Sequence, residues 1–199
     1  MLDKSVPFAG FCMRREPGGP LQDAPLPDGF RFVFYQDGDE KAWARIEAAV
    51  LEFDSDFRAL MFFTDKFLPF KNDLYRRCMF IENTDGEKVA TATAWWSYVD
   101  GYRRPWLHWV AVYPAYQGLG LGKAVVSRVT RLHIELDNNA PIFLKTQTWS
   151  YKAINIYKAN GYLPTDEKTL YSDSKDNYKK AMKILERLDR QRDASKGEY

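Results

Sequence analysis

The chain has 199 residues, of which 45% are hydrophobic and 28% are charged, so it has the length of one globular domain and too many charges for a membrane-embedded protein. Lys and Arg (29) nearly balance Asp and Glu (27), and the resulting net charge of +2 does not favour a nucleic-acid-binding surface. Two cysteines and two histidines do not make a disulfide framework or a metal-ligand cluster, so we expect a cytoplasmic protein without a bound metal.

The sequence indicates no targeting segment and no membrane span. The apolar stretch over 7–13 is too short for a signal peptide and contains Gly10. The uncharged stretch over 105–122 is broken by Pro105, Pro114 and three glycines, which argues against a transmembrane helix. We therefore expect a soluble protein that makes no contact with membranes.

The first 29 residues are rich in residues that break regular structure. Five of the ten prolines lie here: Pro7, Pro17, Pro20, Pro25 and Pro27. Several glycines accompany them. This composition predicts an irregular Pro/Gly-rich arm over 1–29, which is ordered only if Phe8 and Phe11 dock on the body of the protein.

The next segment predicts one strand and one or two helices. Phe and Val dominate 30–35, which predicts a strand. Asp37-Gly-Asp-Glu40 resembles a capping box, and it opens a helix whose apolar face is Trp43, Ile46, Val50 and Phe53. Residues 54–70 continue as a second short helix or a loop rich in phenylalanine.

Residues 77–164 alternate between strand and helix patterns. Strands over 77–82 and 88–98 flank turn residues and predict a hairpin, and 106–112 predicts a central strand because it has few polar groups. A helix is predicted over 118–136, a strand over 142–148, a helix over 150–159 and a short strand over 162–164. This order predicts an α/β fold built on a mixed sheet.

The last 26 residues carry 13 charges, yet their apolar residues fall on one helical face: Tyr178, Ala181, Met182, Leu185 and Leu188. We predict an amphipathic helix followed by a frayed tail. The helix would dock on the body of the protein or on a second subunit, so a homodimer is a candidate assembly.

The most informative segment runs from Val110 to Lys123. A predicted strand enters a loop with Gly118, Gly120 and Gly122, and a helix begins there. Glycines allow backbone N–H groups to converge on a pyrophosphate at a helix N-terminus, although the same glycines also suit tight strand–helix packing. The spacing fits neither a dinucleotide-binding fingerprint nor a Walker loop.

The pattern Gln117-x-x-Gly120-x-Gly122 resembles the signature of the GNAT superfamily of acetyl-CoA-dependent N-acetyltransferases. The segment over 153–162, Ala-Ile-Asn-Ile-Tyr-Lys-Ala-Asn-Gly-Tyr, resembles the second motif of that family. The resemblance covers about residues 30–164. It implies a GNAT-like acyl-CoA N-acyltransferase fold, with a central mixed β-sheet flanked by helices, over 30–170, between the arm (1–29) and the C-terminal helix and tail (171–199).

The resemblance implies that acetyl-CoA is the cosubstrate and which residues hold it. The pantetheine arm would lie beside the strand at Val110, Ala111 and Val112, whose N–H groups would also stabilise the oxyanion. The phosphates would bind the loop residues Gln117, Gly118, Leu119, Gly120, Leu121, Gly122 and Lys123. Ser150 stands where the family usually has an asparagine, and it would act as helix cap and cofactor contact together.

Two residues are candidates for proton transfer. Tyr157 matches the family tyrosine that protonates the CoA thiolate, and the alternative is a tyrosine packed in the core. His108 resembles the strand histidine of arylalkylamine acetyltransferases, where it helps to remove the amine proton; the alternative is a core histidine. Strand alternation places His108 on the same face as Val110 and Val112. His133 is expected to be a surface or packing residue.

The acceptor would be chosen by the aromatic segment 53–70 and by Trp95 and Trp96, unless these rings only fill the core. Glu52, Asp54 and Asp56 could attract a cationic amine or form a solvated helix end. The sequence thus predicts an N-acetyltransferase acting on a primary amine of a small molecule or peptide. The alternatives are a catalytically silent acyl-CoA-binding module and a transferase with another acyl donor.

Overall fold

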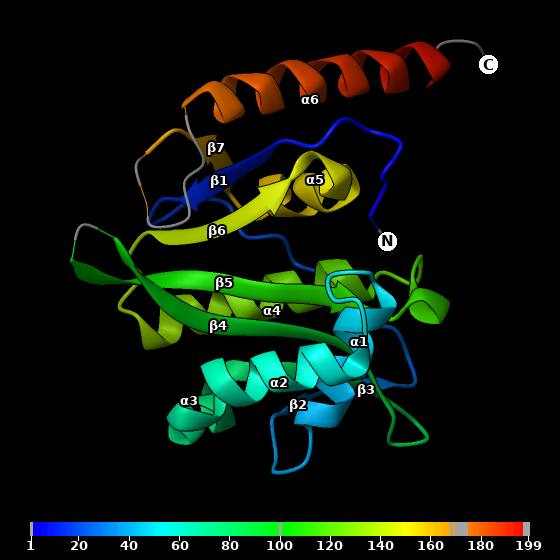
Figure 1. Cartoon of the computed structure of the whole chain (residues 1–199), viewed down its shortest axis with the longest axis vertical. Helices are drawn as coiled ribbons and strands as arrows, with labels where there is room; N and C mark the ends of the chain where they lie inside the picture. The colour runs from blue at the N-terminus through cyan, green and yellow to red at the C-terminus, as the bar shows by residue number, and fades with distance from the viewer. Residues whose placement is uncertain (1, 100, 168, 170–174, 197–199) are drawn as a thin grey trace.

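A seven-stranded mixed sheet forms the centre of the computed structural model, which describes residues 2–99, 101–167, 169 and 175–196 (Figure 1). The strands are β1 (Gly10–Arg15), β2 (Phe30–Phe34), β3 (Cys78–Asn83), β4 (Lys88–Val99), β5 (Tyr102–Val112), β6 (Ile142–Gln147) and β7 (Tyr162–Thr165). They lie in the order β2-β3-β4-β5-β6-β1-β7. Adjacent strands are antiparallel except β5 and β6, which are parallel. The predicted mixed α/β sheet is confirmed.

Helices cover both faces of this sheet. One face carries α1 (Glu40–Ala49), α2 (Asp56–Lys66) and α3 (Lys71–Arg77), and the other carries α4 (Leu121–Leu136), α5 (Tyr151–Ala159) and α6 (Lys175–Lys196). Single 3-10 turns occur at Leu68–Phe70, Pro114–Tyr116 and Thr148–Ser150. Each face has its own apolar cluster: aromatic rings dominate beneath α1–α3, and aliphatic side chains dominate beneath α4–α6.

Two predicted helix starts differ from the structure. α4 begins at Leu121 rather than 118, because Gly118 and Gly120 have φ angles of 88° and 87° that do not continue a helix. The capping box predicted at Asp37–Glu40 does not form, since Asp37 bonds Lys71 and Tyr75 of α3 instead. α3 is a separate helix that the sequence pattern did not predict.

The expectation of an irregular N-terminal arm is wrong for residues 10–15. These residues form β1, an inner strand that pairs with β6 on one side and β7 on the other. Phe11 and Met13 are buried in the same cluster as α4 and α5. The buried Arg15 guanidinium donates hydrogen bonds to the carbonyls of Asn160 and Gly19, 3.0 and 2.5 Å away. The prolines lie outside β1, so they do not prevent its pairing.

The predicted C-terminal amphipathic helix is confirmed as α6. It packs on β1 and places Ala181 and Leu185 in the apolar cluster. The predicted frayed tail at 197–199 lies outside the described residues. Among the helices of the described part, none combines the length and the apolar character needed to cross a bilayer.

Candidate functional site

The two parallel strands in the middle of the sheet separate and leave a cavity between them. Among the described residues, the β5–β6 register joins Trp106 to Phe143 alone. A cavity of about 610 Å³ occupies the region beyond this pair. Its walls come from both faces of the sheet, because Glu47 and Val50 of the α1 region line it together with Leu121 and Tyr157 of α4 and α5. The cavity therefore passes through the sheet.

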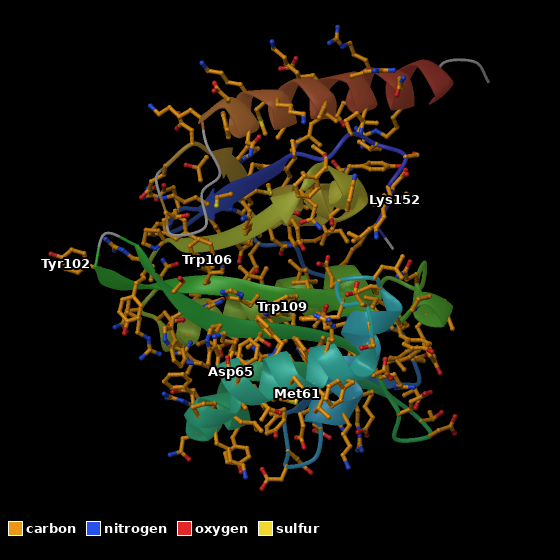
Figure 2. All side chains as sticks on the ribbon, viewed as in Figure 1. Met61, Asp65, Tyr102, Trp106, Trp109 and Lys152 are labelled. Atoms are coloured by element: carbon orange, nitrogen blue, oxygen red, sulfur yellow. The ribbon has the colours of Figure 1, made fainter. Side chains whose placement is uncertain are left out.

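A β-bulge in β5 shapes the cavity wall. Trp109 has a φ of 52°, and the register with β4 shifts so that Thr91 lies opposite Ala111 while Thr93 lies opposite His108. Trp109 packs on Phe62 of α2, with ring centroids 5.1 Å apart, and Figure 2 shows it on the α2 side of β5. Such strained backbone recurs at functional sites.

Because of this bulge, the predicted orientation of His108 relative to Val110 and Val112 is wrong. Strand alternation places His108 on the same face as Val110 and Val112, but one extra residue in the strand reverses that relation. His108 shares the face of Thr93 and Ala111, toward α1–α3, whereas Val110 and Val112 pack toward α4. All four of these β5 residues still line the cavity.

The glycine loop and the start of α4 form one end of the cavity. Gly118 and Gly120 have left-handed backbone, and Gly120 is the N-cap of α4. The Gln117 side chain anchors the loop by donating Nε2–H to the carbonyl of Val112, 2.9 Å away. No acidic residue occupies the first turn of α4, so its N–H groups and positive dipole face the cavity without a competing carboxylate.

Most residues predicted from the sequence line this one cavity. These are His108, Val110, Ala111, Val112, Gln117, Gly118, Gly120, Leu121, Gly122, Lys123, Ser150 and Tyr157. Leu119 is not among the lining residues, and its side chain is exposed. Ser150 is the N-cap residue of α5, but its side chain makes no capping hydrogen bond there.

Two lysines and one glutamate that line the cavity were not predicted from the sequence as site residues. Lys145 of β6 and Lys152 of α5 join Lys123 in the lining and give it three cationic side chains. Figure 2 labels Lys152. Glu47 of α1 also lines the cavity. Glu47 follows Trp43 by four residues and precedes Val50 by three, so it lies on the predicted apolar face of this helix. A charged residue on an apolar face was the sequence signal that could have identified it.

The predicted aromatic acceptor pocket is largely core packing. Phe53, Phe62 and Phe67 pack around Trp43 and are absent from the cavity lining. Trp95 and Trp96 stack on each other with centroids 4.0 Å apart and do not line the cavity either. Four aromatic side chains do line it: Trp106, Trp109, Tyr116 and Tyr157. Of the three acids expected near an amine, Glu52 lines the cavity and Asp54 and Asp56 do not.

Burial sets the protonation states in the cavity. It raises the pKa of Tyr157, with nearby Glu52 and Glu47 adding to the effect, so the phenol stays neutral. It also lowers the pKa of His108 to about 3, and the second histidine, His133, contributes to this shift. His108 is therefore a neutral ring at physiological pH.

His133 is fully buried and structural. Its Nδ1 hydrogen bonds Asp137 Oδ2 over 2.7 Å, and Arg77 of α3 forms an ion pair with Asp137 over 2.9 Å. These contacts join the end of α4 to α3. The expectation that His133 serves packing agrees with this position.

Comparison with known proteins identifies the family whose fold contains this cavity. A model of the acetyltransferase (GNAT) family matches residues 27–162. A GCN5-related N-acetyltransferase from Sphaerobacter thermophilus is 20% identical with a TM-score of 0.63, over 80% of this chain and 49% of that one. A GCN5-related N-acetyltransferase from Kribbella flavida is 21% identical with a TM-score of 0.53, over 78% and 54%.

A tandem GNAT protein from the clavulanic acid biosynthesis pathway is 16% identical with a TM-score of 0.56, over 82% of this chain and 52% of that one. The chain thus spans about half the length of these solved structures. No curated protein sequence matches it. At these identities, the structural likenesses establish the fold and leave the substrate open.

Proposed function

The chain belongs to the GNAT family of acetyltransferases, and on this premise we propose that it transfers the acetyl group of acetyl-CoA to a primary amine of a small molecule or peptide. The observation that carries the proposal is the cavity through the sheet. It brings the glycine loop, the bulged strand β5 and Tyr157 to one space that is open to both faces. A donor and an acceptor can therefore meet in it from opposite sides.

The residues of the α4 side suit the donor. Gly118 and Gly120 leave open space where a Cβ would stand, since an added Cβ meets no atom within 4 Å at either position. Phosphate groups can approach the N–H groups of 118–123 there, with Lys123, Lys145 and Lys152 supplying positive charge. When bound, acetyl-CoA supplies the activated acetyl group.

The backbone of β5 suits the acetyl end of the donor. Beyond Trp106 the β6-facing edge of β5 has no ladder partner among the described strands. We propose that Val110 and Val112 present N–H groups along this edge, to hold the pantetheine amides and the carbonyl oxygen as it gains negative charge. Ala111, between them, pairs with Thr91 of β4.

Tyr157 is the proposed general acid. A phenol held neutral by burial keeps its proton until a stronger base forms beside it. The leaving thiolate can accept this proton because burial raises the pKa of thiols as well, as it raises the pKa of the Cys78 thiol to about 12. Burial weakens both acids, so the transfer from Tyr157 to sulfur is completed when the acetylated nitrogen gives its second proton to the Tyr157 phenolate.

His108 is the second predicted site for proton transfer. It lines the cavity on the face toward α1–α3. Its pKa of about 3 lies far below that of an alkylammonium, and direct transfer would cost about 10 kcal/mol at about 1.4 kcal/mol per pKa unit. We propose that its neutral ring orients the acceptor or a water by hydrogen bonding.

The test is a thiol-release assay with acetyl-CoA and a panel of primary amines, run beside calorimetry of acetyl-CoA binding. We expect micromolar binding and turnover that depends on the amine. Tight binding without turnover on any amine would favour the silent acyl-CoA-binding module. Faster turnover with succinyl-CoA or a longer acyl-CoA would favour a different donor. Sedimentation of the same sample tests the homodimer.

A further inference from the structure

A buried carboxyl group of α1 faces the cavity without a partner. Glu47 is 1% exposed, and its Oε1 accepts no hydrogen bond from the described residues. It lines the cavity together with Val50 and Glu52. A carboxyl in this state is costly for a fold, because burial removes its water and nothing replaces the lost hydrogen bonds. Such a group points to a ligand.

Among the described residues, none of the groups that interact electrostatically with Glu47 is a cation. Its electrostatic neighbours are Glu52 in the loop after α1, Cys78 of β3 and Tyr157 of α5. Lys4 interacts with Glu52, and the cavity lysines belong to α4, β6 and α5. The α1 side of the cavity therefore combines two carboxyl groups with apolar walls from Val50, Trp109 and Ala111.

We propose that Glu47 binds the ammonium group of the acceptor and removes its proton, and that the acceptors are small primary amines with an apolar body and no neighbouring carboxylate. This rests on the proposed acetyl transfer. The apolar body of the amine packs on Trp109 and Val50, which line this side of the cavity. A carboxylate beside the amine would meet Glu47 and Glu52 as a like charge, so free amino acids are rejected.

The proton balance is complete with the residues present. The Glu47 carboxylate takes one proton from R–NH₃⁺, and the freed lone pair forms the N–C bond to the acetyl carbon as the C–S bond breaks. The second nitrogen proton replaces the one that Tyr157 gives to sulfur. Glu47 then returns its proton to solvent. The products are the amide, the thiol and one proton.

The empty site and the occupied site differ in charge. Burial raises the pKa of Glu47 well above its ordinary value, and the negative charge of Glu52 adds to this, so the empty site holds a neutral carboxyl. An ammonium ion supplies the opposite charge that ionises it. Amine binding therefore releases about one proton, a signature that a merely structural glutamate would not give.

The test compares the wild-type protein with Glu47→Gln, which keeps the shape and removes the charge, and with Asp54→Asn, an exposed acid that does not line the cavity. The probes are 2-phenylethylamine and phenylalanine, which differ by one carboxylate. We expect Glu47→Gln to lower kcat/KM for 2-phenylethylamine about 100-fold or more and to keep the Kd of acetyl-CoA. Asp54→Asn should stay within threefold of wild type. Phenylalanine should be the poorer acceptor by at least tenfold.

Calorimetry of 2-phenylethylamine binding to the CoA-saturated protein, in buffers of different ionisation enthalpy, should show about one proton released by the wild type and none by Glu47→Gln. Because Gln keeps the shape of the neutral carboxyl and never ionises, Glu47→Gln should also melt at the same or a higher temperature. A variant that retains kcat/KM, an unchanged proton release, or a large drop in Tm would each overturn the inference. Absence of thiol release with all amines refutes acetyl transfer instead, and proton-linked amine binding still decides the role of Glu47.

Discussion

Replacing Gly120 by alanine separates the backbone strain of the glycine loop from its role in binding acetyl-CoA. Gly120 has a φ of 87°, and Gly86 in the β3–β4 turn has a φ of 79°. A Cβ added at either position meets no atom within 4 Å. The two substitutions therefore carry the same penalty, about 1–2 kcal/mol for a left-handed L-residue, and each should lower Tm by roughly 2–8 °C.

The two variants should differ in acetyl-CoA binding. The Cβ of Gly120→Ala would occupy the open space above the N–H groups that begin α4, where a phosphate is proposed to lie. Loss of one charge-assisted hydrogen bond, about 1.5–3 kcal/mol, predicts a Kd about 10–150-fold weaker. Calorimetry measures this, and Gly86→Ala should keep the wild-type Kd. A Gly120→Ala protein as destabilised as Gly86→Ala, yet with wild-type affinity, would refute the phosphate site.

Three further predictions concern proton transfer and stability. Tyr157→Phe should lower kcat for thiol release by about 10²–10⁴-fold and keep the Kd of acetyl-CoA; an unchanged kcat would remove Tyr157 from the mechanism. Because burial lowers the pKa of His108 to about 3, His108→Asn should keep any rise of rate near neutral pH, and its loss would mark His108 as the base. Burial alone would raise the pKa of Asp137, but hydrogen bonds from His133 and Arg77 prevail and lower it to about 2. This carboxylate then contributes about 2 kcal/mol above pH 4, lost as the pH falls to about 2, so the difference in unfolding free energy between wild type and Asp137→Asn should shrink over that range.

Much of the fold follows from local patterns in the sequence. The hairpin β3–β4, the strand–loop–helix around the glycines and the C-terminal helix each carry a clear periodicity or turn signal. β1 was not predicted because the residues on either side of it in the sequence are rich in proline, and because its partners β6 and β7 lie far away along the chain. Composition over 1–29 describes the flanks of this strand and not the six residues that pair.

The sequence predicted most of the residues of the candidate site, but it did not predict the face of the sheet on which His108 lies. The glycine loop and Tyr157 were recognised because their spacing is a local property. The bulge at Trp109 has no local signal, since an aromatic residue at positive φ is held there by Trp43 of α1, Phe62 of α2 and Phe53 of the loop between these helices. One inserted residue then moves His108 to the other face, which no strict alternation can anticipate.

The position of β1 has a consequence for how the chain folds. Ala9, just before β1, hydrogen bonds Thr148, which lies 139 residues further along the chain. During synthesis, β1 therefore emerges long before either of its neighbours exists. Closing so long a loop is slow, and until it closes β6 and β7 present open edges to other chains. Capture of β1 is expected to limit the folding rate, and removal of the first 15 residues should lead to aggregation rather than to a shortened native fold.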